Sequence, residues 1–237
     1  MWSILERDQM FTTPVGGHKM DKKNALEVVK KLREESPQRK FVQAVDVVVN
    51  LQDLDFKKPE HQLDFYVVLP HNTGKKKNVV ALVDLDMVEE AKAACDIVIP
   101  LLQFDEYAKD KKRIKKLAKN NDYFIAQSTI MSKIAATFGR TLGPKNKMPN
   151  PKAGCVIAPK TNIKPLYDRL QRTIRVLARN KPLVQLCIGR EDMTNEQLAD
   201  NLFLVYDQLI HHLPKERNNL KNMFIKTTMG KPVKVEV

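Results

Sequence analysis

The chain has 237 residues, a formal net charge of +13 and an apolar content of 43%. This length allows one large domain or two modest ones. The excess of Lys and Arg indicates a polyanionic partner, most often a nucleic acid and less often an acidic membrane. No apolar run approaches the ~20 residues that cross a bilayer, and residues 1–20 do not resemble a secretory signal. The three widely spaced cysteines predict buried, reduced thiols that bind no metal.

The first third of the chain predicts an extension, one helix and two strands. Pro14 and two adjacent glycines break any regular pattern, so residues 1–20 should form a loosely held extension. Apolar residues at helical spacing follow and end at a Ser-Pro pair; they are Leu26, Val29 and Leu32. KFVQAVDVVVN and LDFYVVL predict strands. The first strand places these residues on one mostly apolar face: Phe41, Gln43, Val45, Val47 and Val49.

The middle of the chain changes to short apolar runs that are separated by helical patterns. The runs are VVALVD, CDIVIP and DYFIAQ, and the patterns between them are DMVEEAKAA and DEYAKDKKRIKKLAKN. Short buried strands that alternate with helices predict a parallel sheet covered on both faces.

The earlier pattern then returns. KPLYDRLQRTIRVL predicts a helix with one apolar face, formed by Leu166, Leu170, Ile174 and Leu177. PLVQLCIG predicts a strand, and Thr194 with Gln197 has the spacing of a capping box at the start of an amphipathic helix. MFIKTTMGKPVKVEV predicts two extended segments hinged at Gly230.

Two segments with an α+β pattern enclose a segment with an alternating α/β pattern, and this arrangement indicates an inserted domain. We therefore predict an α/β protein with two domains. Residues 21–69 and 159–237 form a discontinuous α+β outer domain, and residues 70–158 form an inserted α/β three-layer, Rossmann-like domain. Residues 1–20 are the N-terminal extension. The two crossings, near LPHNTG and VIAPKT, can act together as a hinge.

Little in the sequence supports catalysis. HNTGKKKN lacks the first glycine of a phosphate-binding loop and has no Ser or Thr after Lys75. His211 and His212 have no third ligand nearby in the sequence, so we expect no metal. No glycine fingerprint for a dinucleotide and no nucleophile motif occurs. We expect no catalytic residue, no cofactor and no enzymatic activity.

Two basic segments each have two interpretations. KDKKRIKKLAKN (109–120) is either a solvated helix face or a face that contacts phosphates. In TLGPKNKMPNPKAG (141–154), three prolines and two glycines predict a stiff loop that bears Lys145, Lys147 and Lys152. This loop is either a rigid support for the second crossing or a secondary RNA contact that needs little ordering on binding.

LGPKNKMPNPKAG closely resembles the signature of the ribosomal protein L-one family, the stalk protein of the large ribosomal subunit. NLQDLDFKKPEHQLDFYVVLPHNTGK resembles the archaeal and eukaryotic branch, so the resemblance is of archaeal type. DYFIAQ, NIKPLYDRL, LADN and TTMGKPVKV also match in the same order. The resemblance covers nearly the whole chain from about Asp21. Asn72 and Lys231 stand where the family usually has glycine and proline.

The resemblance implies a principal rRNA site on the outer domain. The matching positions are Lys40, Phe41, Arg179, Asn180, Lys181, Thr227, Thr228, Met229 and Gly230, with Asn222 as a weaker candidate. Threonine hydroxyls can bond a ribose 2′-OH, glycine allows close approach of the backbone, and cations position phosphates. Taken alone, each of these residues would more often have a structural or solvated role.

The resemblance also implies a function. It describes a cytoplasmic constituent of the large ribosomal subunit, a monomer within the ribosome, that binds stalk rRNA and assists the movement and release of exit-site tRNA. It further implies a translational repressor that binds its own mRNA. Two alternatives stay open, a non-specific nucleic-acid-binding scaffold and an RNA-processing enzyme. We expect no membrane partner.

Overall fold

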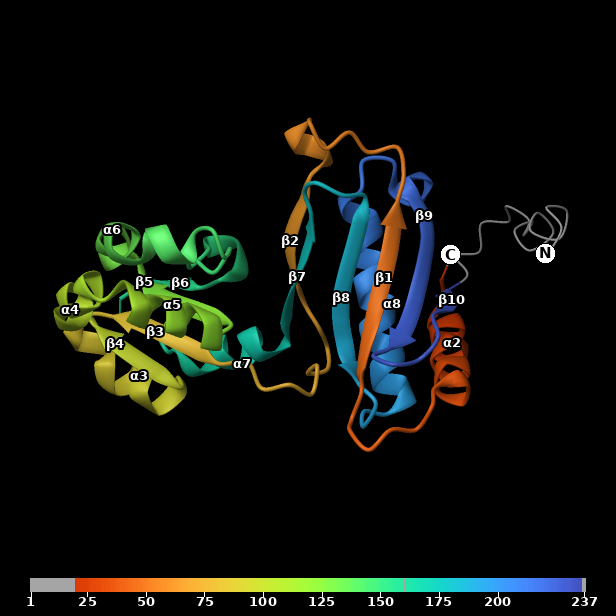
Figure 1. Ribbon diagram of the computed structural model, residues 1–237, viewed down its shortest axis with the longest axis horizontal. Helices are drawn as coiled ribbons and strands as arrows, with labels where there is room; N and C mark the ends of the chain where they lie inside the picture. Colours follow the sequence, from red (N-terminus) through yellow and green to blue (C-terminus); the bar gives the residue numbers. More distant parts are fainter. Residues whose placement is uncertain (1–19, 160, 236–237) are drawn as a thin grey trace, which may run out of the picture.

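The computed structural model describes residues 20–235 except residue 160. Two lobes joined by two crossings of the chain are visible in Figure 1. Of the expected extension, residues 1–19 lie outside the described residues, and the side chain of Met20 is buried in the core of the outer domain. No helix in the described part of the chain is long and apolar enough to span a bilayer.

The outer domain is a four-stranded antiparallel sheet in the order β10-β9-β1-β8, with two helices packed on one face. Its elements are α2 (Lys22–Glu35), β1 (Ala44–Leu51), β8 (Leu183–Arg190), α8 (Asn195–His212), β9 (Leu220–Thr227) and β10 (Val233–Val235). Val45, Val47 and Val49 alternate along β1 and are buried against the helices, as predicted. The capping box of Thr194 and Gln197 is also confirmed, at the start of α8.

A two-stranded antiparallel ribbon, β2 (Leu63–Val68) with β7 (Thr173–Ala178), lies beside this sheet and leads toward the second lobe (Figure 1). A short 3-10 turn, η1 (Pro59–His61), precedes β2. The ribbon contradicts one prediction, because the helix α7 (Lys164–Arg172) ends before Ile174 and Leu177. These two residues lie on a strand, since a run rich in β-branched residues pairs there with β2.

The inserted domain has the predicted three layers around a parallel sheet in the order β4-β3-β5-β6. One apolar cluster joins the sheet to α4, α5 and α6, and another joins its opposite face to α3 and α7. The strands are β3 (Val79–Val83), β4 (Ile97–Pro100), β5 (Tyr123–Gln127) and β6 (Val156–Ile157). The remaining helices are α3 (Val88–Ala94), α4 (Phe104–Lys109), α5 (Lys111–Asn120) and α6 (Met131–Leu142), with 3-10 turns η2 (Leu85–Met87), η3 (Leu101–Gln103), η4 (Ser128–Ile130), η5 (Pro151–Ala153) and, in the outer domain, η6 (Glu216–Asn219).

The packing of α7 bears on the limits of the insertion. Ile163 and Leu170 belong to the same apolar cluster as Val79 of β3. Since β7 begins directly after α7 and pairs with β2 of the outer domain, the chain changes lobes between residues 172 and 173. We therefore propose a second limit near residue 172, while the limits 70–158 stay a prediction.

Gln171 ties the two crossings to each other. Its side-chain oxygen accepts a hydrogen bond from the Lys77 amide at 2.9 Å, and its side-chain nitrogen donates to the Lys77 carbonyl at 2.7 Å. The residue is only 8% exposed. One side chain therefore satisfies both peptide groups of a residue in the first crossing.

Replacing Gln171 with alanine should lower the free energy of unfolding by about 1–3 kcal/mol, because both peptide groups of Lys77 lose their partner in a sheltered place. Chemical denaturation measures this difference. Gln185, an exposed glutamine on β8, provides the matched control, and its replacement by alanine should change stability by less than ~0.5 kcal/mol. Equal losses in the two variants would contradict a tie between the crossings.

Candidate nucleic-acid interface

Residues 40–43 and 227–230, here called the platform, lie together at one end of the outer sheet. The Thr228 hydroxyl accepts a hydrogen bond from the Ala44 amide at 3.1 Å, and the Thr228 amide donates to the Ala44 carbonyl at 3.0 Å. The Met229 amide donates to the side-chain oxygen of Gln43 at 3.0 Å. These bonds join segments that are 184 residues apart in the chain.

Gln43 is the buried polar centre of the platform, and its side chain is fully inaccessible to solvent. Besides accepting from Met229, this side chain donates to the Pro37 carbonyl at 3.0 Å. The Gln43 carbonyl accepts from the Glu191 amide at 2.9 Å, so three segments meet at this residue. The sequence placed Gln43 on the inward face without assigning it a role. The sequence feature that could have indicated this role is a single polar residue among inward-facing apolar ones, because a buried polar side chain requires hydrogen-bond partners.

Large apolar side chains are exposed around this buried centre. Phe41 is 52%, Val42 50% and Met229 57% exposed. Phe41 lies before β1, which begins at Ala44, so the prediction that it shares the buried strand face is wrong. Exposed aromatic and thioether groups beside an exposed backbone turn suit the face of a ribose or an unstacked base. Lys40 is exposed next to them, where it can reach a phosphate.

Gly230 occupies a position without room for a side chain. A Cβ atom there would lie 2.2 Å from the Thr227 hydroxyl oxygen and 3.2 Å from that of Ser36. Thr227 is buried, and its hydroxyl shares a hydrogen bond of 3.1 Å with Ser36. Thr227 therefore faces inward and supports the turn, whereas Thr228 and Met229 are exposed.

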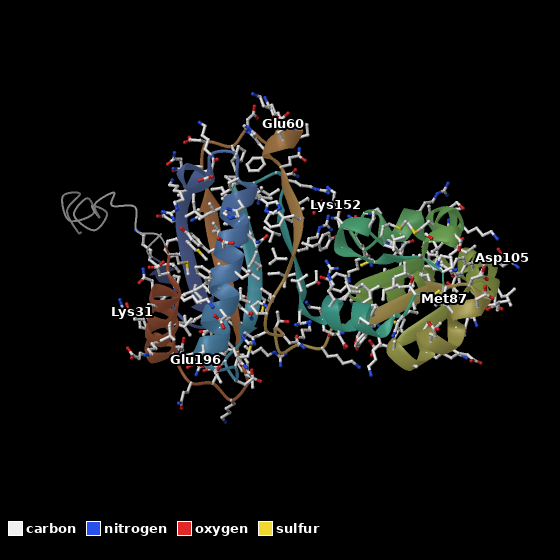
Figure 2. All side chains as sticks on the ribbon, turned by 180° about the vertical axis from the view of Figure 1, so that it is seen from behind. Lys31, Glu60, Met87, Asp105, Lys152 and Glu196 are labelled. Atoms are coloured by element: carbon white, nitrogen blue, oxygen red, sulfur yellow. The ribbon has the colours of Figure 1, made fainter. Side chains whose placement is uncertain are left out.

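The other predicted site residues do not lie on the platform. The register of β1 on β8 pairs Ala44 with Arg190 and Asn50 with Leu183. Residues 179–181, which precede β8, therefore lie at the opposite end of the sheet, about 20 Å away at ~3.4 Å per residue. Asn222 pairs with Asn50 and also lies toward that end. Glu196, after the platform end of β8, and Glu60 mark the two ends in Figure 2.

Arg179 forms an ion pair with Asp64. Its guanidinium lies 2.6 Å from the Asp64 carboxylate, which also accepts two hydrogen bonds from Arg175, at 2.7 and 2.9 Å. The hydrogen bonds from Arg175, and after them the single bond from Arg179, hold the pKa of Asp64 below its usual range. Lys181 is exposed and forms no ion pair among the described residues, and Asn180 is exposed beside it.

The open face of the sheet connects the two ends, and sequence reasoning missed it. Opposite the helices, the outward positions of the central strands carry Asp46, Val48, Asn50, Gln185, Asn222, Phe224 and Lys226. Burial raises the pKa of Asp46, against the opposing effect of Lys226. The alternating residues of VDVVVN and MFIKT could have predicted this face, since every second residue of a strand covered on one side points away from the core.

The stiff loop before β6 is bonded to the middle of α5 and to the residue that follows this helix. The Lys145 ammonium donates to the Lys115 carbonyl at 3.3 Å, and the Lys147 ammonium donates to the Asn121 carbonyl at 2.6 Å. Gly154 adopts a φ of 75°, which favours glycine. Lys152 is exposed, and Figure 2 shows it on the side of the inserted domain that faces the outer one. These contacts fix the loop to the inserted domain, and each ammonium keeps further donors for a ligand.

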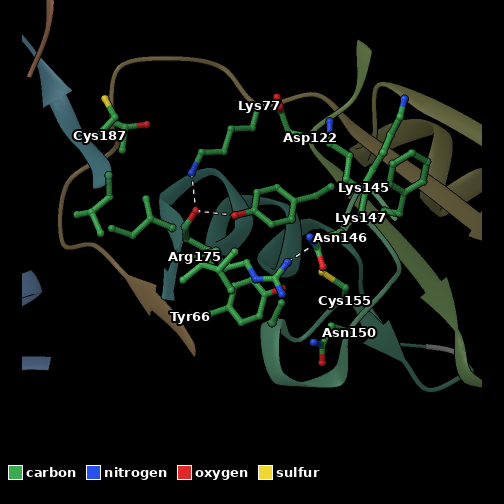
Figure 3. A pocket seen from close by; sticks show the side chains of 18 of the residues that line it. Tyr66, Lys77, Asp122, Lys145, Asn146, Lys147, Asn150, Cys155, Arg175 and Cys187 are labelled. Carbon is green, nitrogen blue, oxygen red and sulfur yellow. Dashed lines mark hydrogen bonds between the residues drawn. The ribbon is translucent and has the colours of Figure 1, made fainter. Parts of the chain in front are cut away.

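A cavity of about 560 Å³ lies where the two lobes meet (Figure 3). Lys77 and Tyr123 both donate to the Thr173 carbonyl, at 2.5 and 2.9 Å, and Arg175 donates to the Asn146 carbonyl at 3.1 Å. Burial lowers the pKa of Lys77 to about 8. Cations that line the cavity are Lys75, Lys77, Lys145, Lys147 and Arg175. In the described ranges, no three His, Cys, Asp or Glu side chains gather as a metal site.

The fold and these surfaces define a basic two-domain protein in which a parallel-sheet domain interrupts an antiparallel-sheet domain. Residues 30–231 match the sequence model of the Ribosomal protein L1p/L10e family, and the chain belongs to this family. The resemblance inferred from the sequence motifs is thereby confirmed. The family consists of ribosomal proteins, so the chain belongs to a structural class and not to an enzyme class.

Three archaeal relatives illustrate the similarity, and each is a large ribosomal subunit protein uL1. The chain is 41% identical to that of Methanobrevibacter smithii over 211 residues, which covers 89% of this chain and 97% of the relative. It is 40% identical to that of Thermococcus kodakarensis over 218 residues, 91% and 98% of the two chains. Identity to that of Pyrococcus horikoshii is 38% over 218 residues, 91% and 97% of the two chains.

Proposed function

We propose that this protein is a structural constituent of the large ribosomal subunit that binds a folded stalk segment of rRNA through the platform. The relatives are named as proteins of that subunit. The observation that carries the proposal is the turn at residues 228–230, which is held by the Ala44 and Gln43 hydrogen bonds beside the exposed Phe41. Because the turn is already ordered, binding costs little conformational entropy.

Each platform group has a defined role in this proposal. The Thr228 hydroxyl and the exposed backbone contact ribose 2′-OH groups, which distinguish RNA from DNA. Phe41 and Met229 pack on a ribose or base, and Lys40 positions a phosphate. Recognition depends on the shape of the RNA, and no covalent bond is made or broken.

Replacing Thr228 with valine should weaken binding of stalk rRNA at least about fivefold, because a hydrogen bond to the RNA, worth about 1 kcal/mol, is lost together with the bond that the hydroxyl accepts from the Ala44 amide. Thr228→Ser keeps the hydroxyl and should retain nearly full affinity. Filter binding with the stalk fragment measures both variants, and circular dichroism checks that they fold. Valine and wild-type chains of equal affinity would remove Thr228 from the site.

An unrelated RNA of equal length separates this function from that of a non-specific scaffold. We expect the wild-type chain to prefer the stalk fragment at least tenfold at physiological salt. Equal affinity for both RNAs would favour the scaffold, because phosphate contacts alone carry no sequence or shape information.

We further propose that the protein represses its own mRNA and assists exit-site tRNA. A message that presents the same RNA shape should occupy the platform, so stalk rRNA should compete with the message in a footprinting experiment. For tRNA, the two crossings provide a hinge about which the inserted domain moves relative to an rRNA-bound outer domain. Asn180 and Lys181 are far enough from the platform to contact a different part of the bound RNA.

A further inference from the structure

The exposed face of α5 is a regular array of cations. Ile114 and Ala118 turn inward and belong to the apolar cluster of the inserted domain. The exposed side chains opposite them fall into two rows at i, i+4 spacing, Lys111-Lys115-Lys119 and Lys112-Lys116. Successive members of a row rise by about 6 Å along the helix axis. The array therefore presents positive charge at regular intervals over about two turns.

A groove between α5 and α6 continues this array. It has a volume of about 490 Å³ and is lined by Lys115, Lys116, Lys119, Arg140, Thr141, Pro144 and Lys145. Five of these seven residues are cations, and Pro144 and the Thr141 methyl group supply apolar surface. Cations beside apolar surface suit a ligand that alternates phosphate with ribose or base.

No acid neutralises this surface within the described part of the chain. None of the groove cations forms an ion pair there, and no carboxylate is among the residues that line the groove. The nearby Asp110 is occupied as the N-cap of α5, where it accepts from the amides of Lys112 and Arg113. Arg113 itself stacks over the Tyr107 ring at 4.3 Å and is not part of the array. The cations are thus available to an external polyanion.

Lys145 connects the groove to the cavity between the lobes, because it lines both. The cavity adds Lys147, Lys75 and Lys77, with Asp122 as the one carboxylate among its lining residues. Together the groove and the cavity are lined by nine cations, more than a small anion or a single nucleotide can contact. Contact with all of them requires a polymer with regularly spaced negative charges.

We propose that the groove between α5 and α6 is a second RNA-binding surface, which holds the phosphodiester backbone of an RNA segment that the platform does not contact. The proposal rests on the proposed function only in taking RNA as the partner. An acidic protein segment fits this surface less well. One short peptide would have to place a carboxylate opposite each lysine of the two rows and opposite the cations of the cavity. Backbone phosphates supply that regularity without any sequence requirement.

The test uses the full chain and two variants that remove equal charge. The groove variant is Lys115→Gln with Lys119→Gln and Arg140→Gln. The control variant is Lys92→Gln with Lys164→Gln and Lys215→Gln, which are exposed residues away from the groove. The probe is a fluorescent RNA hairpin of about twenty base pairs, unrelated to the stalk, and its affinity is measured between about 50 and 200 mM salt. Circular dichroism and thermal melting confirm that both variants fold.

We expect the groove variant to bind the hairpin at least about tenfold more weakly than the control variant at low salt. The slope of log Kd against log salt should also fall by about 2 to 3, since each lost phosphate contact removes nearly one unit. Equal losses in both variants would overturn the proposal, because net charge alone would then explain them. Displacement of the hairpin by polyglutamate of equal charge, at equal concentration, would also overturn it and indicate an acidic protein partner.

The platform variant Thr228→Val distinguishes the two proposals. It should keep hairpin binding, and the groove variant should keep most of its affinity for the stalk fragment. If Thr228→Val weakens stalk binding while the groove variant behaves like its control, the second surface is refuted and the platform stands. If the groove variant alone loses both RNAs, the platform is refuted instead.

Discussion

A Gly230→Ala chain should bind stalk rRNA at least about tenfold more weakly than the wild type. The added methyl group would lie 2.2 Å from the Thr227 hydroxyl oxygen, well inside contact distance. Thr227 is buried and bonded to Ser36, so it has little space into which to retreat. The turn must shift instead, and the shift displaces Thr228 and Met229 from the positions at which we propose that they contact RNA. The strain should also lower the free energy of unfolding by about 1–3 kcal/mol.

Gly139 provides the matched control for this substitution. It lies in α6, where a Cβ atom would meet nothing within 4 Å. Gly139→Ala should leave stalk binding unchanged and raise stability by about 0.5–1 kcal/mol, since alanine is the better helix former. Filter binding and chemical denaturation of the two variants test the pair. A Gly230→Ala chain with wild-type affinity would show that the turn does not touch the RNA.

Removing the entire inserted domain should, in contrast, leave affinity for stalk rRNA within about threefold of the wild type. The Leu69 amide donates to the Arg172 carbonyl at 3.0 Å, so these residues are already paired at the end of the β2–β7 ribbon. An Asn-Gly turn in place of residues 70–171 would close the ribbon as a two-residue hairpin. The apolar cluster of the outer domain contains no residue from the removed segment.

The shortened chain has its own control in the unrelated hairpin RNA. Hairpin affinity should fall, because the groove between α5 and α6 is removed with the inserted domain. A folded product that has lost stalk binding would place the principal site in the insertion and contradict the platform. Circular dichroism of the product distinguishes that outcome from unfolding.

The insertion was predictable because the features that indicate it are local. Short continuous apolar runs between helical patterns distinguish residues 79–127 from the alternating strand at 44–51, and the three predicted layers are present. The boundary between α7 and β7 was not predictable in this way. Ile174 and Leu177 fit a helical period, but pairing with a strand more than a hundred residues earlier decided their conformation.

The arrangement of the candidate site depended on strand register, which sequence spacing does not reveal. Residues 40–43 and 227–230 share one end of the sheet, whereas residues 179–181 lie at the other, because β8 runs antiparallel to β1. Family motifs identified both groups but not their separation. The partners of Gln43 and Arg179 likewise come from distant segments, so their contacts became visible only in the fold.

The order in which a ribosome makes this chain has a consequence for when it can bind RNA. Residues 79–172 are contiguous, so the inserted domain can fold while the remainder is still being synthesised. The outer sheet must wait, since its central strand β1 lacks a neighbour on one side until β9 emerges. A nascent chain without residues 220–230 therefore has no platform. If the platform binds rRNA as proposed, incomplete products should not bind it there, because the two halves of this surface are made at opposite ends of translation.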